Sequence, residues 1–452
     1  MQDHHPPKVL MIGWEFPPVF TGGLGIACQA IARCLSEEVD LSVIVPLSTE
    51  GYEEEGYSLF DTYRNAYTSS EVYKTEAEIV AEKGSWRDLV NKHKVNVALD
   101  PYETAEAPVL APVPAVTETV SENPALSGRG ATSRDELFST KSLYDKDLGH
   151  RISEFANRTV ALVNEKGLMP DLIYAHDWMT FPAALSLKEA TGKRVVLHVH
   201  STDYDRNGGV SYGNFTSQLE KEAFELADHI ITVSSYTAHL LETRYGVSPE
   251  KMTVAHNGYK FRPEEAKATS SFSEKLVLFL GRITAQKGPE FFFRIISKVA
   301  EKNAGVRFVM AGTGDRLKSA IEASAFSEIA HKIHFTGFLN REEVYKLYSM
   351  ADIYCMPSVS EPFGLTALEA ASMGLPCVLS KQSGVAEVLE GALTADYYDV
   401  DAYARHILKL LEDEDLYSDV VERQLMATKK LTWEAGCTQI MNVFRTLLTD
   451  SE

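Results

Sequence analysis

The stretch SEPFGLTALEAASMG, residues 360–374, places one glutamate before an expected helix and a second glutamate inside it. The apolar run 353–356 before it has the composition of a buried strand, and the small residues after the glycine predict a short helix. The first amides of such a helix have no partner within it, so those of Phe363, Gly364 and Leu365 would point toward the loop mouth. The stretch therefore predicts an anion-binding helix start behind a strand.

The two glutamates of this stretch serve different positions. Glu361 lies in front of the helix, and Glu369 lies about five residues inside it, ~7 Å further along the axis at ~1.5 Å per residue. That separation does not suit an acid and a base that face one bond. It suits an elongated, hydroxyl-rich ligand with a sugar at one end, a ribose at the other and an anion between them. In isolation, Glu369 is also compatible with a plain surface charge of the helix.

Apolar runs without strict alternation recur along the chain and are separated by helical patterns, which predicts parallel sheets covered on both faces. The expected strands fall into two series, at 8–12, 41–46, 171–175, 195–200, 229–233 and 252–255, and at 276–281, 306–311, 332–336, 353–356 and 376–380. We therefore expect an α/β protein with two doubly wound, Rossmann-like domains.

A polar segment poor in aliphatic residues, 260–274, separates the two series and is interpreted as a linker. It divides the chain into a first domain over 1–262 and a second domain over 263–430. The remaining residues, 431–452, have apolar positions at a spacing of ~3.6, which predicts one amphipathic helix.

The stretch 50–150 stands where a short connection of the first domain is expected. Within it, residues 104–132 contain four prolines and no aromatic residue, a composition that cannot bury much surface. We interpret 50–150 as an insertion that includes a mobile or polyproline-like excursion. Its composition carries no signal of a function.

Composition limits the partners of this chain. A net charge of −20 over 452 residues argues against nucleic acid or an anionic membrane as the main partner. No run approaches about eighteen apolar residues, so no integral membrane segment is expected, and the start MQDHHPPKVLMIGWEF has no signal-peptide pattern. The scattered cysteines fit reduced, buried thiols of a cytoplasmic protein; they are Cys28, Cys34, Cys355, Cys377 and Cys437.

A phosphate-bearing ligand of so acidic a protein needs a local cationic pocket, and GRITAQKG predicts one after an expected strand. Arg282 can fork two oxygens of a diphosphate, and Lys287 supplies a point charge; the alternative is two surface charges on a loop. The loop GWEFPPVFTGGLG ends in Gly22 and Gly23 before a helix, where amides can approach an anion. Its spacing is not GxGxxG, and it is also compatible with a glycine-rich tight turn.

The segment HVHSTDYDR places polar side chains at the end of another expected strand. His198 and His200 are two residues apart and share one face of that strand. A third metal ligand is not evident, so no metal site is expected. Asp203 and Asp205 are compatible with a cation pair, a ligand-facing loop or a surface turn, and we favour the surface turn. Asp177, after the neighbouring strand, is compatible with a plain helix N-cap.

These motifs together resemble the retaining glycosyltransferases of the GT-B fold, and most closely family 4 and the related glycogen and starch synthases. The resemblance rests on SEPFGLTALEAASMG with GRITAQKG upstream, and on GWEFPPVFTGGLG, YAHDWMT and HVHST. It covers nearly the whole chain except 50–150 and implies two Rossmann-like domains that face a central cleft. It also implies that the last helix, around Trp433, crosses back to the first domain.

The resemblance implies a role for each matching residue. Arg282 and Lys287 would hold the pyrophosphate of a nucleotide-sugar donor, and Glu361 would accept hydroxyls of the donor sugar. Glu369 would bind the ribose, and His200 would lie near the anomeric carbon. His200, Arg282, Lys287 and Glu361 are therefore the expected catalytic residues.

The remaining expected contacts to the donor come from the backbone. Gly22 and Gly23 would close over the phosphates from the opposite domain, and the amides of Phe363–Leu365 would lie alongside the donor. Thr21 stands where the bacterial ADP-glucose synthases carry a lysine, which moves the resemblance toward family 4.

The implied activity is retaining transfer of a sugar, glucose in the first instance, from UDP- or ADP-glucose to a glycan acceptor, as in glycogen or α-glucan synthesis. No cofactor and no required metal are implied. No carboxylate is placed as a covalent nucleophile, so we expect a front-face reaction in which the departing phosphate takes the acceptor's proton. The alternatives are a nucleotide-sugar 2-epimerase, a family-4 transferase acting on a lipid, small-molecule or cell-envelope acceptor, and a non-catalytic binding protein.

Overall fold

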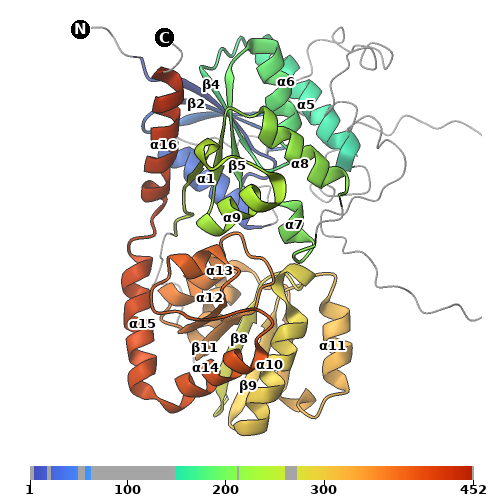
Figure 1. Ribbon diagram of the computed structural model, residues 1–452, viewed down its shortest axis with the longest axis vertical. Coiled ribbons are helices and arrows are strands. Elements are labelled where there is room, and N and C mark those ends of the chain that lie inside the picture. The colour runs from blue at the N-terminus through green and yellow to red at the C-terminus, as the bar shows by residue number, and fades with distance from the viewer. Residues whose placement is uncertain are drawn as a thin grey trace, which may run out of the picture.

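The computed structural model describes residues 5–17, 22–48, 56–62, 148–210, 213–259 and 272–449. These residues form two α/β domains stacked along the long axis of the molecule, the first in blue to green and the second in yellow to red (Figure 1). Each domain is built on a parallel sheet flanked by helices, so the predicted fold class is confirmed. No helix of the described ranges is long and apolar enough to cross a membrane.

Within the described residues, the first sheet has seven parallel strands in the order β3-β2-β1-β4-β5-β6-β7. Their bounds are β1 (Lys8–Ile12), β2 (Asp40–Val45), β3 (Tyr57–Asp61), β4 (Leu172–His176), β5 (Arg194–Val199), β6 (His229–Thr232) and β7 (Met252–Val254). The strand order reverses between β1 and β4. Open parallel sheets bind ligands at the carboxyl ends of the strands beside such a reversal.

The second sheet, again counted over the described part of the chain, has six parallel strands in the order β10-β9-β8-β11-β12-β13. Their bounds are β8 (Lys275–Leu280), β9 (Val306–Ala311), β10 (Ile333–Gly337), β11 (Ile353–Met356), β12 (Cys377–Ser380) and β13 (Leu393–Ala395). Here the order reverses between β8 and β11, which places the loops after these two strands side by side.

Helices connect the parallel strands. The first domain contains α1 (Gly23–Leu35), α5 (Leu148–Glu165), α6 (Phe181–Thr191), α7 (Asp203–Arg206), α8 (Phe215–Leu226), α9 (Ser235–Leu240), η1 (Leu241–Tyr245) and η2 (Pro249–Lys251). The second domain contains η4 (Ala285–Lys287), α10 (Pro289–Lys302), α11 (Leu317–Ala325), η5 (Ala330–Lys332), α12 (Arg341–Met350), α13 (Leu365–Ser372), η6 (Gly384–Glu387), α14 (Val400–Glu412) and α15 (Glu414–Thr428). The last helix is α16 (Trp433–Thr449).

Every strand expected from the apolar runs is present, and three of them, β1, β9 and β11, have the predicted bounds. The short strands β3 and β13 were not predicted. β3 lies inside the stretch 50–150 but pairs with β2, with Tyr57 opposite Leu41. Residues 57–61 therefore belong to the sheet rather than to an insertion, because this strand pairs with the edge of β2.

Three predictions concern residues that the structure does not describe. The proline-rich residues 104–132, most of the expected linker 260–274 and Thr21 lie outside the described residues.

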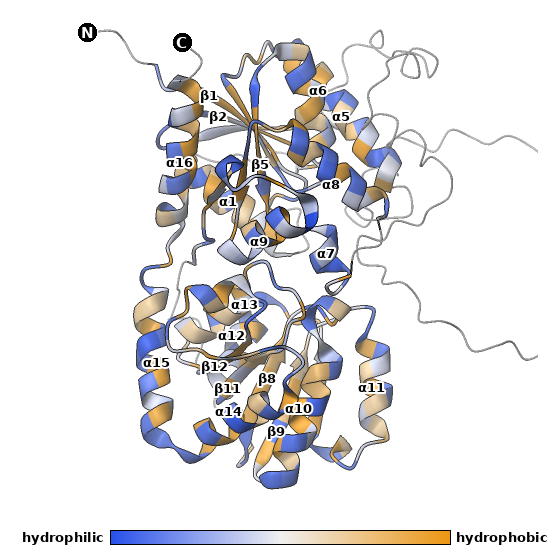
Figure 2. Cartoon of the chain, in the orientation of Figure 1, coloured by the Kyte–Doolittle hydropathy of each residue, from blue (hydrophilic) through white to orange (hydrophobic). Residues whose placement is uncertain are grey.

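Apolar side chains fill the space between each sheet and its helices, and Figure 2 shows the strands mainly in orange and the outer helix faces largely in blue. β4 is buried along its whole length, as expected for a central strand covered on both faces. Ile173 and Leu197 in the first domain, like Val277 and Ile353 in the second, are 0% exposed. Burying each such side chain contributes roughly 1.5–3 kcal/mol.

The helix α16 packs on α1 of the first domain, whereas α15 before it packs on α13 of the second. Where the chain crosses, Tyr259 N donates to Leu431 O at 2.9 Å. A Cβ on Gly258 would lie 2.1 Å from Trp433 N, so this close approach of two chain segments requires glycine. The described end of the first crossing, at residues 258–259, therefore lies beside the second crossing at residues 431–433.

Candidate active site

The predicted helix start is formed by α13, which begins at Leu365 behind β11. Gly364 precedes it with a φ of 108°, in the left-handed region that favours glycine. A Cβ there would come within 3.0 Å of Val385 Cγ1 and 3.2 Å of Met356 Cε. The turn is fixed by Val385 N, which donates to Phe363 O at 2.7 Å. Backbone geometry thus sets the direction of the first amides of α13.

Lys287 and Glu361 form an ion pair in front of this helix start. Lys287 lies in η4, just after β8, and its Nζ contacts Glu361 Oε2. The two side chains are 14% and 8% exposed. Glu361 is also held through its backbone, which donates to Gln382 O at 2.8 Å and accepts from Gly384 N at 2.9 Å. Charges removed from water need such partners, so a ligand that enters here must supply new ones.

A cavity of about 500 Å³ opens beside Arg282 at the carboxyl ends of β8 and β9. Gly281, Asp315 and Phe338 are among its lining residues. Phe338 follows β10 and is 76% exposed, which leaves an aromatic face free for stacking. The structure therefore brings the predicted cation Arg282 to a hollow of ligand size, in the same loop as Lys287.

Glu369 lies within α13 and is half-buried beside α12. Its Oε2 accepts a hydrogen bond from the Tyr348 hydroxyl at 3.1 Å. Burial raises the pKa of Glu369 to about 7, and the Tyr348 hydroxyl and the Arg341 guanidinium partly offset this rise. Glu369 is thus no plain surface charge, and its ionisation changes near neutral pH.

Asp177 holds the backbone of the histidine segment in the first domain. Its Oδ1 accepts from His200 N at 2.6 Å and from Ser201 N at 3.2 Å. Asp177 has a φ of 59°, the one positive value among the described residues other than glycine, and such strain persists where the surroundings impose it. Burial raises the pKa of Asp177 to about 7. The N-cap position of α6 is Thr180, whose side chain makes no capping hydrogen bond, so the N-cap interpretation of Asp177 is wrong.

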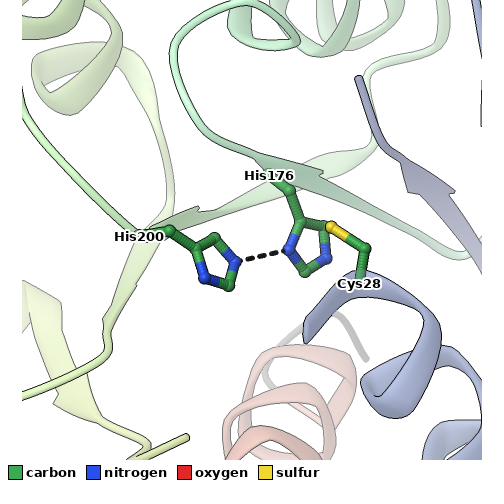
Figure 3. A group of neighbouring side chains, drawn as sticks. All are labelled: Cys28, His176 and His200. Atoms are coloured by element: carbon green, nitrogen blue, oxygen red, sulfur yellow. Dashed lines mark hydrogen bonds between the residues drawn. The ribbon is translucent and has the colours of Figure 1, made fainter. Parts of the chain in front are cut away.

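His200 stacks with two other histidines at the carboxyl ends of β4 and β5. His176 Nδ1 and His200 Nε2 are 2.9 Å apart (Figure 3), and the rings of His198 and His200 have centroids 4.3 Å apart. The Tyr174 hydroxyl bonds to His198 Nδ1. Burial lowers the pKa of His200 to about 3, so its ring is neutral at neutral pH. It can exchange hydrogen bonds with a ligand without carrying charge.

Asp203 and Asp205 are buried in α7, so the prediction of a surface turn is wrong. Asp205 and Thr202 form a capping box at the start of this short helix. Behind it, Arg206 pairs with Glu220 at 2.6 Å, and both side chains are buried. These carboxylates anchor the segment after β5 and are not arranged as a cation pair.

The two domains contact each other at the predicted motifs. Gly22 is the N-cap of α1, and a Cβ on Gly23 would lie 3.3 Å from Leu365 Cδ1 of the second domain. Ser360 donates to Asp205 across the same boundary. The loop that contains α7 also contacts η4. The starts of α1 and α13 therefore face each other, with the histidine segment and the Lys287–Glu361 pair close by.

Some residues of this site were not found from the sequence. Phe338 carries one signal that could have revealed it, an aromatic residue directly after a strand at the ligand edge of the sheet. Tyr348 has no such signal, because it lies within a helix pattern of ordinary core residues.

Two family models match consecutive parts of the chain. Glycosyltransferase Family 4 matches residues 132–261, and Glycosyl transferases group 1 matches residues 261–424. An uncharacterised glycosyltransferase of Methanocaldococcus jannaschii is 24% identical over 97% of this chain and 98% of its own length. The glycogen synthase of Mycobacterium tuberculosis is 23% identical over 97% of this chain and 94% of its own length.

Solved structures share the architecture. The catalytic domain of starch synthase IV from Arabidopsis thaliana, bound to ADP and acarbose, has a TM-score of 0.66 at 16% identity, covering 98% of this chain and 99% of that one. HepE of Anabaena in complex with UDP-glucose has a TM-score of 0.56 at 16% identity, covering 97% and 99%. With the two models joined along 132–424, the chain belongs to the GT-B glycosyltransferases of the family 4 and glycogen synthase type.

Proposed function

We propose that the protein is a retaining, nucleotide-sugar-dependent hexosyltransferase that moves glucose from UDP- or ADP-glucose to a glycan acceptor of the glycogen or α-glucan type. The observation that carries this proposal is the buried Lys287–Glu361 pair at the start of α13. Lys287 lies in the same loop after β8 as Arg282, which lines the cavity. A cation, a carboxylate and a helix start in one place suit a ligand that joins a sugar to a diphosphate.

The donor's diphosphate belongs at the two facing helix starts. Gly23 opens α1 and Leu365 opens α13, and each helix end carries partial positive charge from its backbone amides. Arg282 can fork two phosphate oxygens, and Lys287 adds a point charge. This local cationic site offsets the repulsion that a chain of net charge −20 exerts on a nucleotide.

The two ends of the donor have separate acceptors. The nucleoside belongs in the cavity, where Phe338 offers a face on which a base can stack. Glu369 would accept hydrogen bonds from the ribose, and Glu361 from the hydroxyls of the sugar. His200 would face the anomeric carbon from the first domain as a neutral hydrogen-bonding ring.

The reaction breaks the bond between the anomeric carbon and the diphosphate oxygen and forms a bond to the acceptor oxygen. Negative charge grows on the leaving diphosphate, where Arg282, Lys287 and the amides of α13 stabilise it most in the transition state. The acceptor's hydroxyl proton passes to the departing phosphate oxygen on the same face, so configuration is retained. Contact between the domains excludes water, which limits hydrolysis of the donor.

The glucan acceptor is supported by two neighbours, a glycogen synthase of similar length and a starch synthase bound to acarbose. A 2-epimerase needs an acid and a base at C2 of the sugar. Glu361 is engaged with Lys287 and does not offer a free base in this arrangement, which favours transfer over epimerisation.

The test is a donor screen followed by transfer assays. We expect UDP-glucose or ADP-glucose to raise the unfolding temperature more than GDP-sugars, and glycogen or maltooligosaccharides to be extended with α-linked glucose, detected by NMR of the product. Conversion of UDP-GlcNAc without any acceptor would replace this proposal with the epimerase. Absence of transfer from every stabilising donor to these glucans would refute the glucan acceptor.

A further inference from the structure

The first domain holds a group of metal-ligating side chains that the proposed reaction does not use as such. Cys28 of α1, His176 of β4 and His200 after β5 each offer one ligand atom, and these atoms all lie within 4.8 Å of one another (Figure 3). We propose that these three residues form a binding site for one thiophilic metal ion such as Zn²⁺, and that its occupation inhibits the enzyme.

The ligand set suits zinc in both chemistry and spacing. One thiolate and two imidazoles are zinc ligands, with Zn–S about 2.3 Å and Zn–N about 2.0–2.1 Å, which puts neighbouring ligand atoms of a tetrahedral site roughly 3.3–3.7 Å apart. His176 Nδ1 and His200 Nε2 are now 2.9 Å apart and share a hydrogen bond. An ion between them would replace that bond after movements of well under an ångström in each ring. Three protein ligands leave a fourth position open for water or a substrate group.

Burial points to the same conclusion. His176 is fully buried, and its Nε2 has no hydrogen-bond partner within the described part of the chain. The ligand atom of His176 is its other nitrogen, Nδ1, whose partner is His200 Nε2, so an ion between the two rings would replace this one hydrogen bond in a place shielded from bulk water. Cys28 is also fully buried, whereas His200 is partly exposed and provides the route by which an ion can enter from the domain boundary.

The surrounding charge favours a cation. The carboxylates of Glu15 and Asp177 are the charged neighbours of the Cys28 sulfur. Asp177 also fixes the backbone of His200, because its Oδ1 accepts a hydrogen bond from His200 N at 2.6 Å. A dipositive ion that displaces the thiol proton leaves the ligand set with a charge of about +1, which these two carboxylates can balance.

Inhibition follows from the place of His200. In the proposed function this ring faces the anomeric carbon, so an ion bound to its Nε2 would fix the ring against His176 and place a dipositive charge beside the donor sugar. The ion and its fourth ligand would also occupy the space beside the start of α1. This part of the inference rests on the proposed function, whereas metal binding itself does not.

Binding can be tested with Co²⁺, a spectroscopic substitute for Zn²⁺, added to the purified full-length protein. We expect thiolate-to-cobalt charge-transfer absorption and intense visible bands of tetrahedral cobalt in the parent protein, with one ion bound per chain. Cys28→Ala should lose the charge-transfer band, and Cys28→Ser serves in its place should the alanine variant not fold. Cys34→Ala is the matched control, since it removes a thiol from the same helix outside the group and should keep the band. An equal band in Cys28→Ala and the parent would overturn the site.

Inhibition is tested with Zn²⁺ in the transfer assay. Cys28 has no contact in the proposed donor site, so Cys28→Ala should transfer sugar at the parent rate but need at least tenfold more Zn²⁺ for half inhibition. EDTA should restore the parent, and Cys34→Ala should behave as the parent. Equal zinc sensitivity of Cys28→Ala and the parent would overturn the inhibitory role. A parent that shows the cobalt band but transfers no sugar before zinc is added would refute the proposed function alone.

Discussion

Lys287 and Glu361 neutralise each other in a site that is largely closed to water, so each depends on the other when no donor is bound. A donor's phosphate would draw the ammonium and its sugar hydroxyls would draw the carboxylate. In the proposed function, the pair would hold both groups in place before the reaction, so little rearrangement would be required as charge moves to the leaving group.

We expect Lys287→Ala and Glu361→Ala each to lower kcat/KM by about 100-fold or more, because each removes a group that stabilises the transition state. The measurement is steady-state transfer with the best donor from the screen. Truncating one partner of a buried pair also costs about 3–5 kcal/mol, so thermal unfolding must show that the variants are folded at the assay temperature. Lys381→Ala, which breaks the exposed pair with Asp396, is the control and should leave kcat/KM unchanged. Near-parent transfer by both buried variants would remove these residues from the active site.

We expect Glu369 to make donor binding depend on pH, if it binds the ribose as proposed. Its pKa is raised to about 7 by burial against the opposing effects of the Tyr348 hydroxyl and Arg341, with Tyr259 also facing it. A raised carboxyl pKa means that the neutral acid dominates below about pH 7 and the carboxylate above it. Ribose hydroxyls need the carboxylate as acceptor, so donor affinity should fall by up to tenfold per pH unit below pH 7.

Calorimetric titration with an intact nucleotide-sugar measures this effect, because its diphosphate does not titrate near neutral pH. Glu369→Gln is the control: it should bind more weakly at pH 8 and lose the dependence between pH 6 and 8. The same dependence in Glu369→Gln would assign it to another group, with Asp177, whose pKa is also about 7, as the next candidate.

At the scale of single residues, the sequence was most informative about charged residues that follow an expected strand within a short motif. Glu361, Lys287 and Arg282 were expected together from their motifs, and the structure pairs Glu361 with Lys287 and places Arg282 at the cavity in the same loop as Lys287, whereas their roles stay predictions. The sequence predicts that Cys28 is a small buried residue, and its burial is confirmed. Its neighbours His176 and His200 follow strands that are distant from Cys28 in the sequence. No local sequence pattern could predict that α1 and the ends of β4 and β5 come together in this way.

At the scale of elements, α13 depends on the turn before it. Gly364 adopts a φ of 108°, and a Cβ would meet Val385 and Met356 at 3.0 and 3.2 Å. Gly364→Ala should therefore lower the free energy of unfolding by about 1–3 kcal/mol, through backbone strain and displaced side chains. Urea denaturation measures it.

The matched control for this prediction is Gly22→Ala, at the start of α1. Gly22 has a φ of −158° and no atom within 4 Å of an added Cβ, so its stability should change by less than about 0.5 kcal/mol. Equal stability of the two variants would mean that the turn at α13 tolerates a side chain, and that its glycine serves the ligand alone.

Strands were predicted where both faces are covered, because their apolar runs are nearly continuous. β9 and β11 match their predicted bounds for this reason. In the middle of β3 one residue is exposed and two are partly exposed, and the strand lies at the sheet edge, so its sequence YSLFD gives a weak signal. β13 has three residues, too few for any periodicity to register.

At the scale of the whole molecule, the family resemblance predicted two facing domains. It did not predict which side chains form the contacts between them. Ser360 and Asp205 are 155 residues apart, yet they hydrogen-bond across the boundary. Tyr236 also bonds to Ser360, at 2.8 Å. The stretch that precedes α13 therefore also forms contacts with the first domain, and in the proposed function donor binding and domain contact should support each other.

Glu387 of η6 makes a second contact between the domains. Its Oε1 accepts from Ser235 N at 2.7 Å and bonds to His256 Nε2 at 2.7 Å, and its Oε2 accepts from Tyr236 N at 3.2 Å. These amides begin α9, where a carboxylate is favoured by the partial positive charge of the helix end. Burial alone would raise the pKa of Glu387, but the bonds from His256 and the amides lower it. Glu387 is therefore ionised at neutral pH.

Glu387→Ala should weaken domain closure without unfolding either domain. Hydrogen bonds to a charged group contribute about 1.5–3 kcal/mol, and partial exposure reduces this toward about 1.4 kcal/mol, so kcat/KM should fall about tenfold and the radius of gyration by small-angle scattering should increase. Glu390→Ala, which breaks an exposed pair with Lys430 inside the second domain, should change neither quantity. If Glu387→Ala keeps the parent's radius and its kcat/KM, Glu387 makes no contribution to closure. The Ser360 contacts would then hold the domains together unaided.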